Sequence, residues 1–341
     1  MKKFFVFSIF ISFSILIAKS INLPLPWLMG PLLSSMVLSF NNFNYKPHIQ
    51  LWNLTRIIIG IYLGSRIDSN FFINLTRWSG SFLILVLLII TSIICVSFIY
   101  RKYGKFDLAT SISSSTPGGM SNIFLALEEM GEKIDPKKHF VTHLTRIFLV
   151  ISFIPFFIRY FVSDLNPPHG ESLFFKFDII EIIKLLSISI VFSFFSSKLK
   201  LPAPVFLGSI IGTGILYGFE LTNYILPDLG LNICLAVIGF SVGSRFSDYQ
   251  FKDFLNNIKF GLFSFLILML LTILFSYISS ILFDLDFLSL VMSYAPGGIY
   301  EMTGIAISFD YEVDFILAHH LARLFLIILI IPFVCKIALK L

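Results

Sequence analysis

The chain has 341 residues, of which 57% are hydrophobic and 13% charged, and its mean hydropathy is +0.90. Soluble domains contain about 45–50% apolar and about 25% charged residues, so this composition predicts a membrane protein with several spanning segments. The net charge of +5 is too small and too dispersed for nucleic-acid binding.

The first half of the chain contains five apolar runs and one interrupted run. The continuous runs, each predicted to be a membrane span, lie at about 4–21, 27–40, 55–67, 79–100 and 140–162. Because no cleavage site is clear after the first run, we interpret it as a span rather than a signal peptide. The interrupted run, at 108–130, is broken by Pro117-Gly118-Gly119, since proline and glycine both disrupt a helix.

The second half repeats this order. Pro296-Gly297-Gly298 follows the first Pro-Gly-Gly by 179 residues (296 − 117), and His320 and Arg323 follow His143 and Arg146 by 177 (320 − 143). Two further elements also recur in the same order: Leu-Pro-x-Pro at 23–26 and 201–204, and Gly-x-x-x-Gly-x-Arg at 60–66 and 239–245. These collinear matches predict an internal duplication, with a first membrane repeat at 1–162, a connecting loop at 163–178 and a second membrane repeat at 179–341.

The paired glycines at 60 and 64 and at 239 and 243 have the spacing that lets two helices approach closely. We interpret both elements as helix contacts rather than as binding sites.

The distribution of lysine and arginine favours halves of opposite orientation. If each Pro-Gly-Gly segment enters and leaves the membrane on the same side, most basic residues fall on the cytoplasmic side. The arms of these segments are also too short to span a bilayer. The predicted fold is therefore an all-α polytopic membrane protein with two inverted repeats, each of about five transmembrane helices plus one re-entrant Pro-Gly-Gly hairpin. The alternative has six spans per half with a broken crossing helix. We expect a multi-pass inner-membrane protein with a cytoplasmic N-terminus.

The hairpin tips are the predicted substrate site. Unpaired amides at helix starts carry partial positive charge, so two starts that meet at a dry midplane favour an anion. Glu301, a carboxylate at membrane depth, is a candidate to carry a proton, to bind Na⁺ or to pair with Arg146 or Arg323; the alternative is a purely structural ion pair. The candidate substrate-binding residues are Ser114, Ser115, Thr116, Pro117, Gly118, Gly119, Asn122, Pro296, Gly297, Gly298, Glu301, His143, Arg146, His320 and Arg323.

The His-x-x-Arg pairs allow two interpretations, because residues three apart share one helix face. Either arginine holds an anionic substrate while histidine tunes protonation, or both residues anchor the helix at the membrane interface. His319-His320 is a weak metal candidate, since adjacent helical side chains point apart. No motif of a hydrolase, nucleotide-binding protein or zinc protease is present, so we predict no catalytic residue, metal or cofactor beyond a coupling ion, H⁺ or Na⁺.

The duplicated Leu-Pro-x-Pro, Gly-x-x-x-Gly-x-Arg and Pro-Gly-Gly/His-x-x-Arg elements resemble the AbrB-type integral membrane family. The family's labels imply either a regulator of gene expression or an ammonia monooxygenase. The residues favour instead an ion-coupled secondary transporter of a small anionic or polar metabolite, whose partners are the lipid bilayer and the solute. Homo-oligomerisation is left open.

Overall fold

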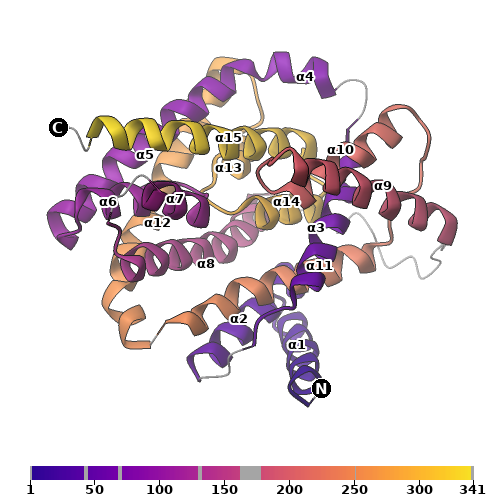
Figure 1. Cartoon of the computed structure of the whole chain (residues 1–341), viewed down its shortest axis with the longest axis horizontal. Helices are drawn as coiled ribbons and strands as arrows, with labels where there is room; N and C mark the ends of the chain where they lie inside the picture. The colour runs from indigo at the N-terminus through magenta and orange to yellow at the C-terminus, as the bar shows by residue number, and fades with distance from the viewer. Residues whose placement is uncertain are drawn as a thin grey trace. The chain divides into compact units, whose positions relative to one another are not determined.

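Helices follow the apolar runs of the sequence almost segment by segment in the computed structural model (Figure 1). The structure describes residues 2–41, 45–67, 71–129, 133–161, 178–249 and 251–338, and these contain helices and no strand. The connecting loop predicted at 163–178 lies outside the described residues, except for Asp178. The all-α prediction is confirmed.

The chain divides into two compact units, each of which draws on both halves of the sequence. The first unit comprises Met1–Thr76, Pro155–Ser247 and Tyr300–Leu317, and the second comprises Arg77–Ile154, Asp248–Ile299 and Ala318–Leu341. Two of the boundaries fall well inside long helices, α8 (Pro136–Phe161) and α15 (Val313–Ala338).

The first unit is assembled from helices with small residues at their contacts. It contains α1 (Lys2–Ser20), α2 (Pro26–Phe40), α3 (Ile49–Gly64), α9 (Ile179–Lys198), α10 (Pro204–Gly218), α11 (Asp228–Ser244) and the short 3₁₀ helix η1 (Arg245–Asp248). A Cβ added at Gly239 would overlap the Leu28 carbonyl of α2, and one at Gly64 would overlap Thr213 of α10. The interpretation of both glycine pairs as helix contacts is confirmed.

Left-handed residues recur at matching places in the two halves of the sequence. Leu25 (φ 47°) and Ala203 (φ 50°) stand directly before the proline that opens α2 and α10. Lys105 (φ 50°) and Asp284 (φ 52°) lie at matching places further along. Non-glycine residues rarely adopt this conformation, so each recurrence marks a backbone requirement of the fold.

The second unit contains the two broken segments. Its helices are α5 (Ser79–Gly104), α6 (Leu108–Ser115), α7 (Met120–Glu129), α12 (Phe251–Phe283), α13 (Phe287–Tyr294) and parts of α8 and α15. Helix α5 packs against α6 and α12, α6 against α7, and α12 against α13. Helix α14 (Ile299–Phe309) begins in this unit at Ile299 and continues in the first unit.

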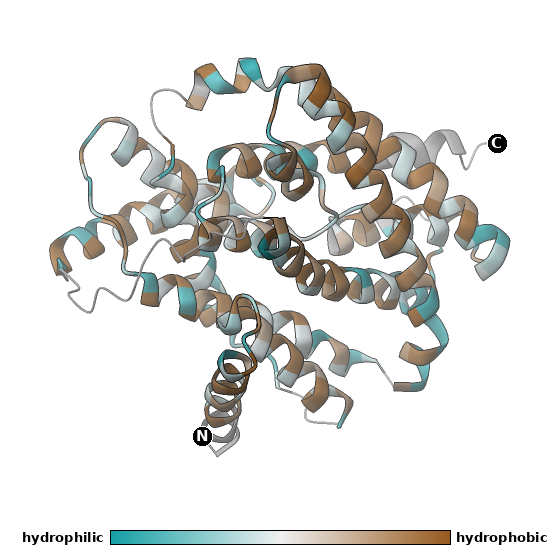
Figure 2. Ribbon diagram, turned by 180° about the vertical axis from the view of Figure 1, so that it is seen from behind, coloured by the Kyte–Doolittle hydropathy of each residue, from teal (hydrophilic) through white to brown (hydrophobic). Residues whose placement is uncertain are grey.

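Within the described residues, six helices are long and apolar enough to cross a membrane. They are Ser79–Gly104, Pro136–Phe161, Ile179–Lys198, Asp228–Asp248, Phe251–Phe283 and Val313–Ile330. Helix α5 exposes Leu83, Leu87, Ile94 and Phe98, which recur at helical spacing along one side. In Figure 2 the long helices are mostly brown, the colour of hydrophobic residues, and the teal of hydrophilic residues lies mostly near helix ends and connections. Such exposed apolar faces are what a lipid bilayer covers.

Two helix starts and one short helix differ from the sequence prediction. Helix α3 begins at Ile49 rather than near 55, because the His48 ring accepts a hydrogen bond from the Gln50 amide at 3.3 Å and caps the helix. Helix α12 begins at Phe251, well before the long apolar run of the second half, which the sequence predicts to span about 260–282. A short helix, α4 (Phe71–Arg77), lies where no element was expected.

Candidate functional site

The first arm of each broken segment begins in the same way. The Asp107 carboxylate accepts a hydrogen bond from the Thr110 amide at 2.8 Å and caps α6. The Asp286 carboxylate accepts one from the Ser289 amide at 2.7 Å and caps α13. Asp at this position satisfies an amide that the helix leaves unpaired, so both arms have a defined start.

Both arms end at the Pro-Gly-Gly tracts. Helix α6 ends at Ser115 and α7 begins at Met120, while α13 ends at Tyr294 and α14 begins at Ile299. Gly118 (φ 115°) and Gly119 (φ 66°) adopt backbone conformations that favour glycine. The helix breaks predicted from these residues are therefore present.

At the first break, a buried guanidinium holds the carbonyl groups that the helix end leaves free. Arg146 Nη1 donates to the Ser114 carbonyl at 3.3 Å, and Nη2 donates to the Thr116 carbonyl at 2.7 Å. Arg146 is the largest fully buried side chain of the described residues. No carboxylate is among its hydrogen-bond and ion-pair partners in the described part of the chain, and its Nε has no partner there.

The second break has a related arrangement. Arg323 donates from Nη1 to the Ala295 carbonyl and from Nη2 to the Gly297 carbonyl, the latter at 2.6 Å. Ala295 corresponds to Thr116 in the duplication, so the two arginines share one equivalent acceptor. Arg323 also reaches the first break, since a Cβ added at Gly118 would lie 3.8 Å from its Nε.

The histidines of both pairs are fixed in one tautomer by their partners. His143 Nδ1 lies 2.7 Å from Arg146 Nη2, and His320 Nδ1 lies 2.8 Å from Arg323 Nη2. Arginine only donates, so each Nδ1 accepts. The two Nε2 atoms face the Ser113 and Met292 carbonyls at 2.9 and 3.1 Å, so each must donate. Both rings are therefore neutral and orient the guanidinium groups.

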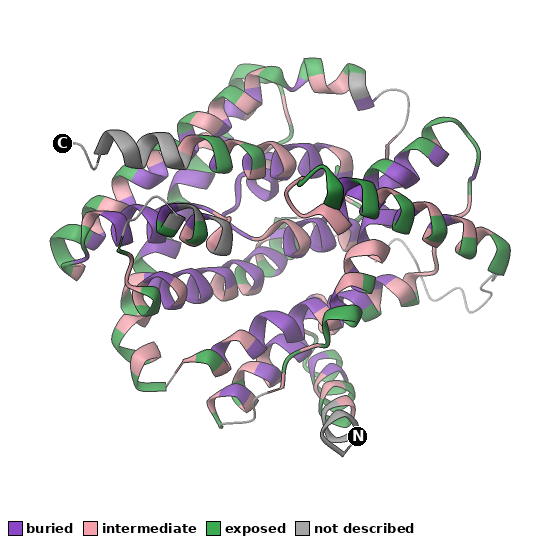
Figure 3. Ribbon diagram, in the orientation of Figure 1, coloured by how far each residue is buried: buried purple, intermediate pink, exposed green. Residues whose placement is uncertain are grey.

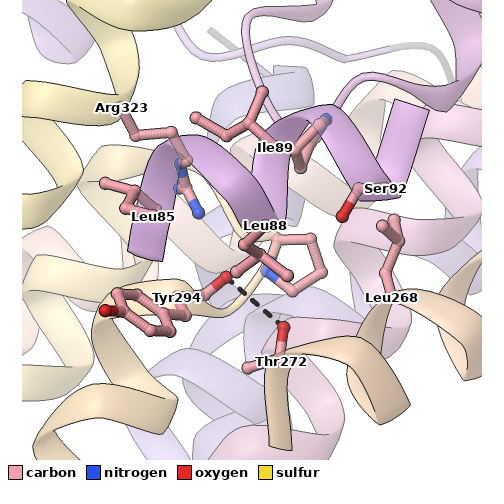
Figure 4. Close-up of a pocket in the computed structure, with 10 residues that line it drawn as sticks. Leu85, Leu88, Ile89, Ser92, Leu268, Thr272, Tyr294 and Arg323 are labelled. Carbon is pink, nitrogen blue, oxygen red and sulfur yellow. Dashed lines mark hydrogen bonds between the residues drawn. The ribbon is translucent and has the colours of Figure 1, made fainter. Parts of the chain in front are cut away.

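A small cavity lies between the two breaks, entirely within the second unit (Figure 4). Its volume of about 10 Å³ is that of roughly one water molecule. Pro117 and Pro296 line it together with Arg323, and Figure 4 shows Ser92 facing it from α5. Thr272 of α12 donates to the Tyr294 carbonyl at 3.4 Å along its edge. In this conformation the breaks enclose no space for a metabolite.

The buried serine hydroxyls of α6 differ in whether they have a hydrogen-bond partner. Ser115 and Thr116 both donate to the Ile112 carbonyl at 2.9 Å, so their hydrogens are already used. The Ser114 hydroxyl is fully buried and has no hydrogen-bond partner in the described part of the protein. The same is true of Ser293, its counterpart on α13. Figure 3 shows this region as largely buried. Buried polar groups without partners are costly, so this matched pair is notable.

The structure does not assign two of the predicted residues to this cluster. Glu301 belongs to the first unit, where it is only 3% exposed and its Oε2 has no partner among the described residues. Its pairing with Arg146 or Arg323 stays a prediction. The side chain of Asn122 lies outside the described set.

The prediction of a metal-free protein also stays untested. Among the described residues, no group of three or more histidine, cysteine, aspartate or glutamate side chains could hold a metal ion. His319 instead lies 2.7 Å from the Ser81 hydroxyl through its Nε2 and stacks on Phe82.

Several residues at this site were missed by sequence reasoning. Ser92 and Thr272 lie within apolar runs that give no local signal of a cavity, and Tyr294 and Ser293 belong to the second tract without standing out. His139 contacts the first arm from α8, but its counterpart in the second repeat is isoleucine, so the duplication could not single it out. The duplicated orphan hydroxyls were detectable in principle, because Ser114 and Ser293 align.

The described residues form helices and include six that are long and apolar enough to cross a membrane, which indicates a multi-pass membrane protein. The family model described as "Transition state regulatory protein AbrB" matches residues 27–338, so the chain belongs to the AbrB family. It is 25% identical over 297 residues to "Uncharacterized protein YhjN" of Bacillus subtilis (strain 168), which covers 82% of this chain and 76% of that protein. No solved structure matches.

Proposed function

We propose that this protein is a secondary transporter that couples the movement of a small anionic metabolite to an ion, H⁺ or Na⁺. The observation that carries the proposal is the pair of helix breaks in the second unit, each held by a buried arginine and joined by one cavity. A buried cation without a carboxylate partner is costly. Arg146 is such a cation, and an anion that binds at the breaks would offset its cost.

The lengths of the arms support a re-entrant arrangement. Helices α6, α7, α13 and α14 have 8, 10, 8 and 11 residues. At ~1.5 Å per residue none of them exceeds about 17 Å, which is roughly half of a hydrocarbon core of ~30 Å. The breaks would then lie near the bilayer midplane, where irregular backbone is tolerated only if protein or a water-filled cavity covers it. A broken helix that crosses fully would satisfy the same lengths.

The matched backbone conformations support two structural repeats, and the distribution of lysine and arginine in the sequence favours their inverted orientation. Left-handed residues recur at corresponding places, and so do the aspartate caps and the hydrogen bonds within the His-x-x-Arg pairs. Inverted repeats whose broken helices meet at a midplane site are typical of secondary transporters. The cavity of about 10 Å³ corresponds, on this proposal, to an occluded state without solute.

The buried hydroxyls of Ser114 and Ser293, which have no hydrogen-bond partner among the described residues, are candidate donors to a solute. Ser114 and Ser293 can each donate one hydrogen bond, and neither is engaged among the described residues. Together with Arg323 they would surround a carboxylate with charge-assisted donors. Glu301, buried without a partner for Oε2, is a second place where the coupling ion could bind.

Uptake into proteoliposomes tests the proposal. Purified protein would be screened with radiolabelled small carboxylates under an imposed pH or Na⁺ gradient, and the matched control would be the Arg323→Gln variant. Ion-dependent uptake by the wild type that the variant lacks is expected. No flux and no binding for any solute, with equal behaviour of both proteins, would contradict the proposal.

A regulatory role is the second candidate, favoured by the description of the matching family. It would require a partner protein that carries the signal to the gene. A stoichiometric partner on purification, in place of solute flux, would favour it.

A further inference from the structure

The histidines of the second unit differ in whether their hydrogen-bond partners allow the imidazole ring to become protonated. Adding a proton to Nδ1 of His143 or His320 would set it against an arginine that can only donate. Those two rings therefore cannot become charged while each Nδ1 accepts a hydrogen bond from its arginine.

His139 has different partners. Its Nε2 lies 3.0 Å from the Met120 carbonyl and must donate, while its Nδ1 lies 3.1 Å from the Ser113 hydroxyl oxygen. The Ser113 oxygen also lies 3.0 Å from the Thr110 carbonyl. A hydroxyl has one hydrogen but can accept as well as donate, so its rotation decides which state of the ring it supports.

Both protonation states of His139 are compatible with this geometry. In the neutral ring, Ser113 donates to Nδ1 and leaves the Thr110 carbonyl. In the charged ring, Nδ1 donates to Ser113, and Ser113 donates to Thr110, so that all three contacts are hydrogen bonds at once. The charged state thus makes one hydrogen bond more than the neutral state, without any movement of heavy atoms.

We propose that His139 is the site of the coupling ion and that this ion is a proton, which binds at Nδ1 while the Ser113 hydroxyl turns toward Thr110. The proposal rests on the transport function above and specifies its coupling ion.

The charges around His139 explain why the proton would bind together with an anion. On its own helix the ring faces His143, at 4.5 Å between centroids, and Arg146 two turns further on. Helix α6 has no titratable side chain between Leu108 and Ser115 and offers only its cap, Asp107. On α7 the ring meets Phe124, and the titratable Glu128 is exposed near the far end of that helix.

Burial, the start of α8 and the charge of Arg146 all oppose a positive charge on His139. An anion at the breaks would reverse that balance. By thermodynamic reciprocity, proton binding would strengthen anion binding by the same factor. His139 and Arg146 would in this way link proton and anion in one transport cycle.

His139 lies next in the chain to solvent-exposed side chains. His139 directly follows Lys137 and Lys138, whose side chains are 63% and 31% exposed. Asp135 lies one turn earlier, and its amide donates to the Thr110 hydroxyl at 2.9 Å. On our proposal, the proton would reach His139 from the exposed start of α8.

Nitrogen NMR of isotope-labelled histidine in the full-length protein in nanodiscs tests proton binding directly, since it distinguishes imidazolium from each neutral tautomer. The His139→Gln variant assigns the signal among the 6 histidines. Spectra would be recorded from about pH 8 to about pH 5, the range of histidine switching, with and without a saturating small carboxylate, acetate being the first probe.

We expect His139 to become charged at higher pH with the probe than without it, while His143 keeps its neutral tautomer throughout. Ser113→Ala removes the acceptor for the charged ring and should lower the midpoint by about one pH unit, a tenfold loss of proton affinity. Ser111→Ala is the matched control, because Ser111 is a buried hydroxyl of the same helix without a partner among the described residues. A His139 ring that stays neutral throughout, or equal effects of both serine variants, would overturn the proposal.

Flux measurements separate this inference from the transport proposal. In His139→Gln, the amide can still donate to the Met120 carbonyl, so the fold is kept. Counterflow exchange of solute should persist at a lower solute affinity, because the proton-linked gain in anion binding is lost, while accumulation driven by a pH gradient should fall at least tenfold. Accumulation driven by Na⁺ and unaffected by this variant would overturn the proton assignment but leave transport standing. A proton that binds His139 in a protein without any flux would overturn transport and the coupling role, and would leave only proton binding at His139 standing.

Discussion

At the first helix break, Arg146 donates to the carbonyls of Ser114 and Thr116, whereas at the second break Arg323 donates to those of Ala295 and Gly297. In the numbering of the duplication, Arg323 thus reaches two residues further toward the second arm. It lines the cavity between the breaks, and Arg146 does not. The first break instead has two glycines at positive φ and a histidine whose contacts tolerate a proton. On our proposal, the second break binds the anion and the first binds the proton.

The largest expected effect comes from removing the arginines separately. Arg323→Gln should lower solute affinity about 100-fold, because a charge-assisted contact is worth up to about 3 kcal/mol. Arg146→Gln should weaken mainly the fold, by about 1–3 kcal/mol, since it leaves buried carbonyls without their hydrogen-bond donor. Solute binding by isothermal calorimetry and thermal unfolding in detergent measure the two effects. If both variants lost the same solute affinity, anion binding could not be assigned to the second break alone.

Backbone strain at the first break gives the next effect. Gly118→Ala places a side chain at φ 115° and should destabilise the protein by about 1–3 kcal/mol. Gly297→Ala is the matched control, because Gly297 is not among the residues with positive φ. Unfolding temperatures of the two variants compare the breaks, and a larger loss at Gly297 would show that the backbone asymmetry has been assigned to the wrong copy.

The orphan hydroxyls should respond equally in both copies. Ser114→Ala and Ser293→Ala should each lower solute affinity about tenfold, because one hydrogen bond to a charged group contributes about 1.5 kcal/mol. Stability should stay the same or rise slightly, since a buried polar group without a partner is removed. Ser115→Ala, whose hydroxyl donates to the Ile112 carbonyl, is the control and should leave affinity unchanged. Loss of stability without loss of affinity would assign these serines to the fold.

The smallest expected effect concerns the helix starts, where the two copies agree. Asp107→Ala and Asp286→Ala should each cost about 1 kcal/mol, the usual contribution of an N-cap. Thermal unfolding of both variants should give similar shifts. A shift at only one of them would show that the two arms are supported differently from their first residue.

Much of this fold can be predicted from the sequence because lipid imposes simple rules. Apolar length predicts where α5 and α12 lie, and Pro-Gly-Gly predicts where the broken segments are interrupted. The three-residue spacing of His143 and Arg146 correctly places both side chains on one face of α8. These are local properties, and local physics decides them.

The partners of these residues could not be predicted in the same way. Gly239 has the spacing of a close contact, but nothing near it in the chain specifies the Leu28 carbonyl. Arginine in a membrane segment suggested an anionic substrate, yet Arg146 first satisfies carbonyls of its own chain. His139 has no duplicated counterpart, and only the contacts with Ser113 and Met120 led to the role that we propose for it. Long-range contacts are properties of the whole chain.

Cysteine accessibility tests the central claim most directly. In a background without Cys95, Cys234 and Cys335, Ser114→Cys and Ser293→Cys would be exposed to a membrane-impermeant thiol reagent from each side of sealed vesicles. The account predicts that each position is labelled slowly from both sides and that a transported solute protects both. Rapid labelling of both positions from one side only, unaffected by any solute, would contradict a transport site at the two breaks.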